Sequence, residues 1–296
     1  MEKLVAAGCL CLALAGVASV PAATRAAPKE PPVMAVFLTE SKGSPLSGDE
    51  VSSLSDYLSS RLGEEGAFQV LPRSEIRSRL GPAAARELDG CHEPVCQHHL
   101  SARVGARYAL SSWVGKVGSQ CLLVADVLDT TSNLLVRSVQ TRDLCQPEMI
   151  IGGFERLAAE LNRSFARPLP GVPEGKRRLA VLLPENRGSP LRADELELLG
   201  QYLRARLLSA VQVECLPSSA LRLQAGDGGP GEPAQLSVHT SVSKIGSQCL
   251  LSAALWDLST DRQIAAVTVR EKCDPDRLVP GLEDLADRLA ALLQKP

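Results

Sequence analysis

The sequence has few aromatic residues, with 4 Phe, 2 Trp and 3 Tyr among 296. This scarcity argues against a base-stacking platform or an aromatic sugar-binding site, because both need several exposed rings. An excess of one charge is also missing, since 32 Lys and Arg stand against 34 Asp and Glu. A protein that coats nucleic acid or anionic lipid needs a basic surplus, so neither partner is expected.

Familiar catalytic motifs are missing as well. The sequence contains no G-x-S-x-G, no H-E-x-x-H and no P-loop. His239 has no counterpart in the first half of the chain and is interpreted as a surface or core residue. Two carboxylate pairs recur, Glu40 with Glu185 and Asp129 with Asp257, at loop starts or hairpin shoulders where carboxylates serve turns. The sequence therefore predicts a protein that is not an enzyme, with no catalytic residue and no cofactor.

Long hydrophobic runs are confined to the amino end. After Lys3, an apolar run extends from Leu4 to Val20 and is followed by Pro21-Ala22-Ala23. This layout predicts a secretory signal peptide over residues 1–22, followed by a flexible Pro-rich lead over residues 23–32. Two alternatives are an uncleaved membrane anchor and a lipid anchor on Cys9. The mature chain is expected to be exported to the periplasm or secreted, with no stable membrane span after cleavage.

The chain contains an internal duplication. From Ala35 to Gly63, 15 of 29 residues are identical to those 145 positions later, and KVGSQCLL at Lys116 recurs as KIGSQCLL 128 positions later. A repeat of this quality fixes the organisation of the chain before any element is assigned. The second copy is 17 residues shorter, the difference between the two offsets, and carries a Gly/Pro-rich loop over Ala225–Ala234. The Pro/Gly-rich segment Pro168–Lys176 is the predicted linker, which gives a first domain over 33–167 and a second over 177–296.

Each copy has the same predicted element order, β-α-β-α-β-β-β-α, an α+β fold of the α/β-layered type in which helices pack on a mixed sheet. The first copy has Leu54, Leu58 and Leu62 on one face of its first helix. Its three long strands are Tyr108–Val117, Cys121–Leu128 and Leu134–Thr141, and the second copy repeats them as Leu236–Ile245, Cys249–Leu258 and Gln263–Arg270. A helix over Pro94–Val104 is expected in the first copy and absent from the second.

Seven cysteines remain after the predicted signal peptide. Cys121 and Cys145 are 24 residues apart, as are Cys249 and Cys273, and each pair brackets a hairpin centred on Asn133 or Asp261. Asn and Asp tolerate the left-handed backbone that such a turn needs. Facing strand positions lie within disulfide reach, so both bonds are predicted.

The remaining cysteines lie in two other places. Cys91 and Cys96 are predicted to form a third disulfide, and Cys215 is left as a buried free thiol. A metal site of Cys91, His92, Cys96, His98 and His99 is the alternative for that cluster, although adjacent His98 and His99 cannot both point one way on a helix.

The first copy resembles a known family of periplasmic domains. Arg73-Ser74-Glu75 follows the FQVLP strand, Gly105-Ala106-Arg107-Tyr108 opens the next strand, and Asp129 stands in the hairpin. These motifs resemble the TolB amino-terminal-like and CsgG-like domains of Gram-negative bacteria over about Val33–Phe165, and more weakly over Arg178–Leu293. Asn133 stands where the family has Gly.

The resemblance implies a non-catalytic envelope module that binds proteins or cell-wall components. The expected function is therefore an exported cell-envelope binding or adaptor protein built from two duplicated interaction modules. A cell-wall-modifying hydrolase and a metal-binding protein are the alternatives.

Overall fold

The structure is a computed structural model that describes residues 31–64, 66–166, 178–211, 213–216 and 234–294. The predicted signal peptide, the linker Pro168–Lys176 and all of the Ala225–Ala234 loop except Ala234 lie outside the described residues. The two copies are called repeat 1 (33–167) and repeat 2 (177–296) below.

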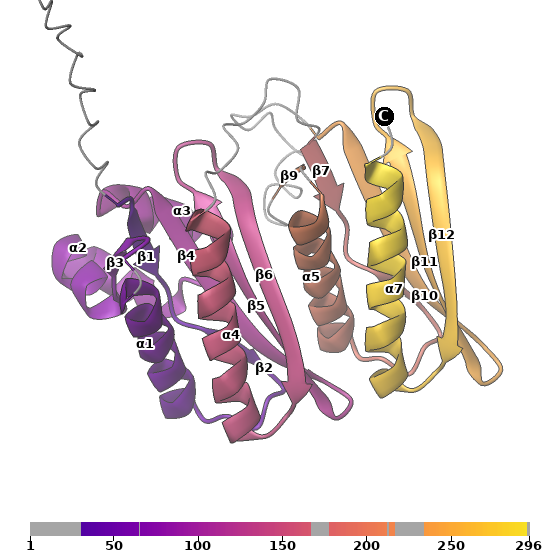
Figure 1. Cartoon of the computed structure of the whole chain (residues 1–296), viewed down its shortest axis with the longest axis horizontal. Helices are drawn as coiled ribbons and strands as arrows, with labels where there is room; N and C mark the ends of the chain where they lie inside the picture. Colours follow the sequence, from indigo (N-terminus) through magenta and orange to yellow (C-terminus); the bar gives the residue numbers. More distant parts are fainter. Residues whose placement is uncertain (1–30, 65, 167–177, 212, 217–233, 295–296) are drawn as a thin grey trace, which may run out of the picture. The chain divides into compact units, whose positions relative to one another are not determined.

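Repeat 1 alternates strands and helices before ending in a three-stranded meander and a long helix (Figure 1). Its elements are β1 (Val33–Val36), β2 (Glu40–Lys42), α1 (Gly48–Glu64), β3 (Gln69–Leu71), α2 (Arg73–Glu87), a short 3-10 turn (Leu88–Gly90), α3 (Pro94–Arg103), β4 (Tyr108–Val117), β5 (Gln120–Asp129), β6 (Leu134–Leu144) and α4 (Pro147–Ala166).

Repeat 2 follows the same order with fewer described helices. Its elements are β7 (Arg178–Val181), β8 (Glu185–Arg187), α5 (Ala193–Ala210), β9 (Glu214–Cys215), β10 (Leu236–Ile245), β11 (Gln248–Asp257), β12 (Arg262–Lys272) and α7 (Pro275–Leu293). The predicted mixed α/β layered fold is confirmed. No described helix combines the length and apolarity needed to cross a membrane.

All strands in the described ranges belong to one mixed sheet. Their order is β12-β11-β10-β7-β9-β6-β5-β4-β1-β3, with β2 on β4 and β8 on β10. The long strands pair antiparallel within each meander, and β1 and β7 pair parallel with their neighbours in the same repeat. The repeats join where β6 meets β9 through the residue pair Leu135 and Cys215. Because this backbone joint is so short, side-chain packing has to hold the two repeats together.

The two faces of the repeat 1 sheet carry different hydrophobic cores. One face packs against α1 and α4, with Leu58, Leu123 and Phe154 among its fully buried side chains. The other face contributes Trp113 and Leu122 to a core that also includes residues of α5 and α7. Consequently β5 is buried along nearly its whole length. In β11, by contrast, buried and partly exposed residues alternate, as in a sheet with one covered face.

Local sequence explains where several elements begin and turn. Ser47 and Glu50 form a reciprocal cap at the start of α1, with the Ser47 amide donating to Glu50 at 2.7 Å and the Glu50 amide donating to Ser47 Oγ at 3.3 Å. Asn133 and Asp261 have φ of 55° and 50°, the left-handed conformation that the sequence predicted for both hairpin turns.

Two short strands and one helix are among the elements that were not predicted. Strands β2 and β8 have three residues each and a polar sequence, so no hydrophobic periodicity marks them. Helix α2 contains Gly81-Pro82, which reads as a break. The structure accommodates it because Gly81 (φ 77°) kinks the helix and Pro82 then occupies the first turn of the next segment, where a missing amide costs little.

The predicted register of the cysteines was wrong in detail. Cys121 on β5 lies opposite Asp143, and the strand pairing shifts between Val127 and Leu128. Cys145 lies two residues further on, where its amide donates to the Ser119 carbonyl at 3.1 Å. Beside the turn Asp129 pairs with Leu134, so the hairpin is centred between Thr131 and Ser132 and not on Asn133. The bulge shifts the pairing by one residue toward Cys145, and the two cysteines are left as diagonal neighbours whose Cα atoms are 4.8 Å apart.

Candidate functional site

The contact between the repeats is built around α5. Its buried residues include Leu198, Tyr202 and Arg204, which together with its other buried positions surround the helix rather than form one stripe. Helix α5 packs against β4, β5 and β6 of repeat 1 and against α7 of its own repeat. Helix α1, at the same place in repeat 1, is buried on one side only. Helix α5 therefore makes a large part of the contact between the repeats (Figure 1).

A buried ion pair crosses this contact. Arg204 on α5 donates to Asp126 on β5 at 2.6 Å, and the two side chains are 9% and 5% exposed. Ser138 on β6 also donates to Asp126. A charge pair this deeply buried is stable only while both partners are present, because either charge alone would be desolvated without compensation.

A polar cavity of about 130 Å³ lies beside the ion pair. Its lining comes from both repeats: Leu38, Glu40, Lys42, His92, Glu93, Pro94, Gln97, Ser111, Ser112, Trp113, Asp126, Leu183, Glu197, Gln201 and Arg204. Lys42 contacts Glu197 at 2.8 Å and Glu40 at 3.2 Å. Burial disfavours the ammonium form of Lys42, but the two carboxylates outweigh it and raise its pKa.

Several polar groups of this cavity are engaged by one another or by neighbouring residues. Glu40 and Glu197 are engaged by Lys42, and the Ser112 hydroxyl is bonded to Thr39 at 2.8 Å. The Trp113 indole nitrogen and the Gln201 amide oxygen make no hydrogen bond within the described part of the chain. In the described lining, no hydroxyl group is hydrogen-bonded to a histidine or carboxylate of the same lining, the arrangement that activates a side-chain nucleophile.

The recurrent carboxylates lie in turns and surface pairs. Asp129 accepts from the Thr131 amide at 2.7 Å, and Asp257 accepts from the Ser259 amide at 2.8 Å. Glu185 pairs with Arg187 at 2.7 Å, which lowers the pKa of that carboxyl. These carboxylates are not brought together in one place.

His239 lies exposed on β10 and stays close to its own strand. Its Nε2 is 3.0 Å from Ser237 Oγ, and its ring centre is 5.9 Å from that of Trp256. The contact with Ser237 places a serine hydroxyl beside an imidazole, and Ser237 itself is buried, with 3% of its surface exposed.

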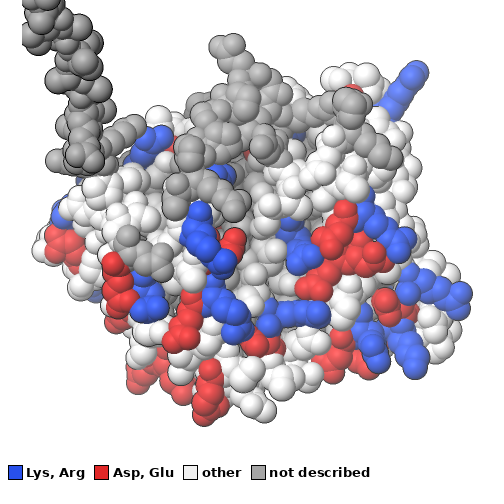
Figure 2. Space-filling model, viewed as in Figure 1, with Lys and Arg blue, Asp and Glu red and all other residues white. Residues whose placement is uncertain are grey.

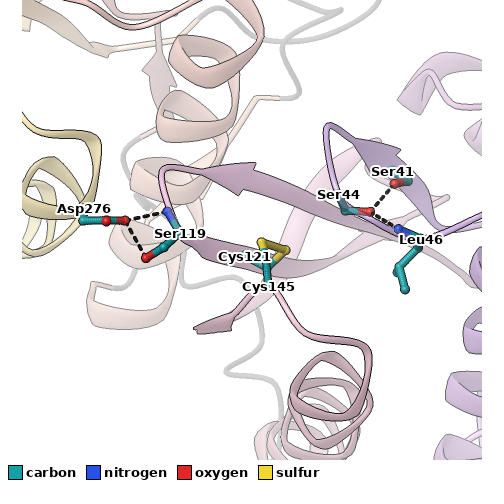
Figure 3. The surroundings of a disulfide bond; sticks show 7 residues. All are labelled: Ser41, Ser44, Leu46, Ser119, Cys121, Cys145 and Asp276. Atoms are coloured by element: carbon teal, nitrogen blue, oxygen red, sulfur yellow. Dashed lines mark hydrogen bonds between the residues drawn. A yellow bond between two sulfur atoms is a disulfide. The ribbon is translucent and has the colours of Figure 1, made fainter.

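The six cysteines predicted to be bonded are paired in the structure. Cys91 bonds Cys96, Cys121 bonds Cys145 and Cys249 bonds Cys273, while Cys215 is buried and unbonded. The last two bonds occupy equivalent places, each between the second strand of a meander and the start of the closing helix. Figure 3 shows the first of them, Cys121–Cys145. Burial raises the pKa of the Cys215 thiol to about 12.

The Cys91–His99 cluster does not converge on a point. Both sulfurs are in the disulfide, His98 Nε2 is 2.8 Å from the Thr130 carbonyl, and His92 and His99 are exposed. Within the described ranges, no three His, Cys, Asp or Glu side chains are grouped to hold a metal ion.

A second hollow lies between α1 and α4 on the surface of repeat 1. We call it the helix groove. It measures about 450 Å³ and is lined by Leu46, Asp49, Glu50, Ser53, Leu54, Tyr57, Pro147 and Ile151. Ile151 and the neighbouring Met149 are 45% and 40% exposed, which is high for large apolar side chains. Figure 2 shows basic and acidic side chains intermixed on one face of the molecule, without a large area of one sign.

The same hollow is filled in repeat 2. The counterparts of Ser53, Tyr57 and Ile151 are Leu198, Tyr202 and Val279, which are 0%, 2% and 0% exposed. Leu198 packs so closely on β4 that a Cβ on Gly115 would lie 2.3 Å from it. Sequence reasoning missed this contact, although replacement of α1 serines by Leu198, Arg204 and Ala205 was a readable signal of a second buried face.

No protein-family profile and no curated protein match this sequence. Several solved structures resemble the chain. The LpoB C-terminal domain from Salmonella enterica is 17% identical, with 38% of this chain and 82% of that one covered and a TM-score of 0.32. Lipoprotein GNA1162 from Neisseria meningitidis is 16% identical (47% and 99% covered, TM-score 0.31). TolB from Acinetobacter baumannii is 10% identical (81% and 51% covered, TM-score 0.30). Values this low describe a distant likeness of fold and nothing about activity.

Proposed function

We propose that this chain is an exported, non-catalytic binding protein of the cell envelope, and that the helix groove of repeat 1 is its partner surface. The observation that carries the proposal is the contrast between two equivalent surfaces. In repeat 2, the α5–α7 surface is buried against a neighbouring sheet, with Leu198 and Val279 fully covered. In repeat 1, the α1–α4 surface is open and presents Ile151.

The shape and chemistry of the groove suit a protein partner. An apolar floor with Asp49 and Glu50 at its rim matches the usual anatomy of a protein interface, in which an apolar centre is ringed by polar groups. The polar cavity is a weaker candidate, since its charged side chains already bind one another. Three disulfides support a location outside the cytoplasm, where such bonds persist.

Site-specific cross-linking tests the proposal. A photoreactive residue at Ser53, in the groove, is expected to cross-link a protein in cells, and Ile151→Asp should abolish that cross-link. The same residue at Arg163, an exposed position at the far end of α4, serves as the control. A cross-link at Ser53 that survives Ile151→Asp would contradict the groove assignment. Hydrolysis of peptidoglycan by the purified chain would contradict the non-catalytic assignment.

A further inference from the structure

The open sheet face is the side of β10–β12 that points away from α7. Its outward residues include Ser243, Ile245, Ser252, Ala254 and Arg270, all partly or fully exposed. The equivalent face of repeat 1 is covered by α3 and by α5. Among the described elements of repeat 2, no helix covers this face. The described part of the chain therefore presents a sheet face in repeat 2 and a helix layer, α1–α4, in repeat 1, the two kinds of surface that pack together between the repeats.

The apolar contact between the repeats has an exposed counterpart at each end of the molecule. Val117 on β4 and Val279 on α7 are both 0% exposed and belong to the same core. The duplication places Ile245 at the position of Val117 and Ile151 at the position of Val279. These two isoleucines are 65% and 45% exposed. Ile245 is thus an exposed apolar residue on a sheet face, at a position that a helix layer covers in repeat 1. Ile151 is an exposed apolar residue on a helix layer, at a position that a sheet face covers in repeat 2.

Residues that make a polar contact between the repeats also have exposed counterparts on the two free surfaces. Asp276 accepts from the Ser119 amide at 2.6 Å and from its hydroxyl at 2.9 Å, joining α7 to the tip of the β4–β5 hairpin (Figure 3). The corresponding residues are Ser247, at the tip of the β10–β11 hairpin, and Glu148, in the first turn of α4. Both are exposed.

A second polar contact repeats the pattern. Arg142 lies 3.2 Å from Glu283, which also accepts from the Tyr202 hydroxyl at 2.7 Å. On the α1–α4 surface of repeat 1, Glu155 accepts a hydrogen bond from the Tyr57 hydroxyl, also at 2.7 Å. On the open sheet face, Arg270 stands at the position of Arg142 and is exposed. The carboxylate, its tyrosine and the arginine are therefore all present, but on opposite ends of the molecule.

Two pairs of residues in the contact between the repeats have no counterparts of the same type on the free surfaces. In each pair, both residues have been replaced and not one alone. Ala254 stands at the position of Asp126 and Ser59 at the position of Arg204, so neither half of the buried ion pair remains. Loss of one partner alone would leave a buried charge without compensation. The close approach of Leu198 to Gly115 is likewise replaced on both sides, by Ser53 and Ser243.

We infer that the open sheet face of one molecule binds the helix layer α1–α4 of a second copy, head to tail, in the arrangement that joins the two repeats within the chain. The inference rests on the proposed function, since it names the partner of the helix groove. Such a contact is heterologous, so it leaves one free end of each kind and propagates to a ring or a filament.

A pair of complementary variants tests the inference on the full mature chain. The wild type is expected to form species larger than a dimer as concentration rises, measured by light scattering and sedimentation velocity. Ile245→Asp disables the sheet end and Ile151→Asp disables the helix end, so each variant alone should be monomeric. Their equimolar mixture retains one intact pair of ends and should stop at a 1:1 dimer.

Controls separate this arrangement from other kinds of association. Leu258→Asp changes an exposed leucine whose repeat 1 counterpart, Thr130, bonds only within repeat 1, so assembly should be unaffected. Arg270→Glu should weaken assembly at least tenfold, and Glu155→Arg on the partner should recover part of that loss. A symmetric interface would give no dimer in the Ile245→Asp and Ile151→Asp mixture and would overturn the inference.

The same variants keep this inference distinct from the proposed function. A wild type that stays monomeric at every concentration, while Ile151→Asp still abolishes a cross-link at Ser53 to a different protein, would overturn self-assembly and leave the groove as a partner site. Assembly that is lost on Ile151→Asp, together with loss of the Ser53 cross-link between copies, supports both.

Discussion

Arg204 and Asp126 make the buried charge pair on which the contact between the repeats depends. Substituting Arg204→Met or Asp126→Ala alone is expected to lower the free energy of unfolding by about 3–5 kcal/mol, because the remaining charge stays buried without its partner. The double variant Arg204→Met with Asp126→Ala should lose much less free energy of unfolding than the two single variants lose together. Chemical denaturation measures all three. Arg206→Met, which breaks the exposed pair with Asp287, is the matched control and should change stability by at most about 1 kcal/mol.

Cys215 gives a prediction for alkaline pH. Burial raises the pKa of its thiol to about 12, so the folded state holds the proton more tightly than the unfolded chain, whose thiol titrates near 9. The resulting stability is fully present below pH 9 and is lost as the pH rises toward 12. Burial and the Glu283 hydrogen bond raise the pKa of Tyr202 in the same sense. Cys215→Ala should therefore flatten the alkaline fall in stability, measured by denaturant unfolding at several pH values. An unchanged pH profile would contradict this assignment.

Helix α5 lies against β4 at a glycine, and this close approach can be tested at the scale of elements. Gly115→Ala is expected to destabilise the protein by about 1–3 kcal/mol, because the new methyl group would overlap Leu198. Adding Leu198→Ala makes room for that methyl, so the double variant should be less destabilised than the two single variants predict together. A double-mutant cycle gives the coupling. Strict additivity would mean that the two residues do not touch.

Strand periodicity was the most informative signal in the sequence. The strands Tyr108–Val117 and Leu236–Ile245 have the predicted bounds, and Asn133 and Asp261 adopt the predicted turn conformation. Helix α2 was missed because Gly81-Pro82 interrupts its pattern. The helix groove could not be predicted, since its openness depends on which surfaces meet in space. The replacement of α1 serines by Leu198, Arg204 and Ala205 in α5 is the sequence signal that the helix of one copy is covered on a second face and that of the other is not.

At the scale of the whole molecule, the described strands form one sheet, and a hydrophobic core is shared between the repeats. The predicted division into two domains can therefore be tested by cutting between them. A specific protease site introduced within residues 168–176 should allow the chain to be cut there. The two fragments are expected to elute together under native conditions, because α5 remains packed on β4–β6 and Arg204 remains bonded to Asp126. They should separate only in denaturant. Two fragments that part freely after cleavage would mean that each repeat is stable without the other.

Cys215 also occupies an unusual place in the sheet. It faces Leu135 across the single described residue pair between β6 and β9, and its parallel neighbour is Leu179. A thiol reagent can reach it only when this seam parts, because the side chain is completely buried. The rate of thiol labelling at Cys215 in the native protein would therefore measure how often the β6–β9 joint opens, and so report how often the two repeats separate at this joint.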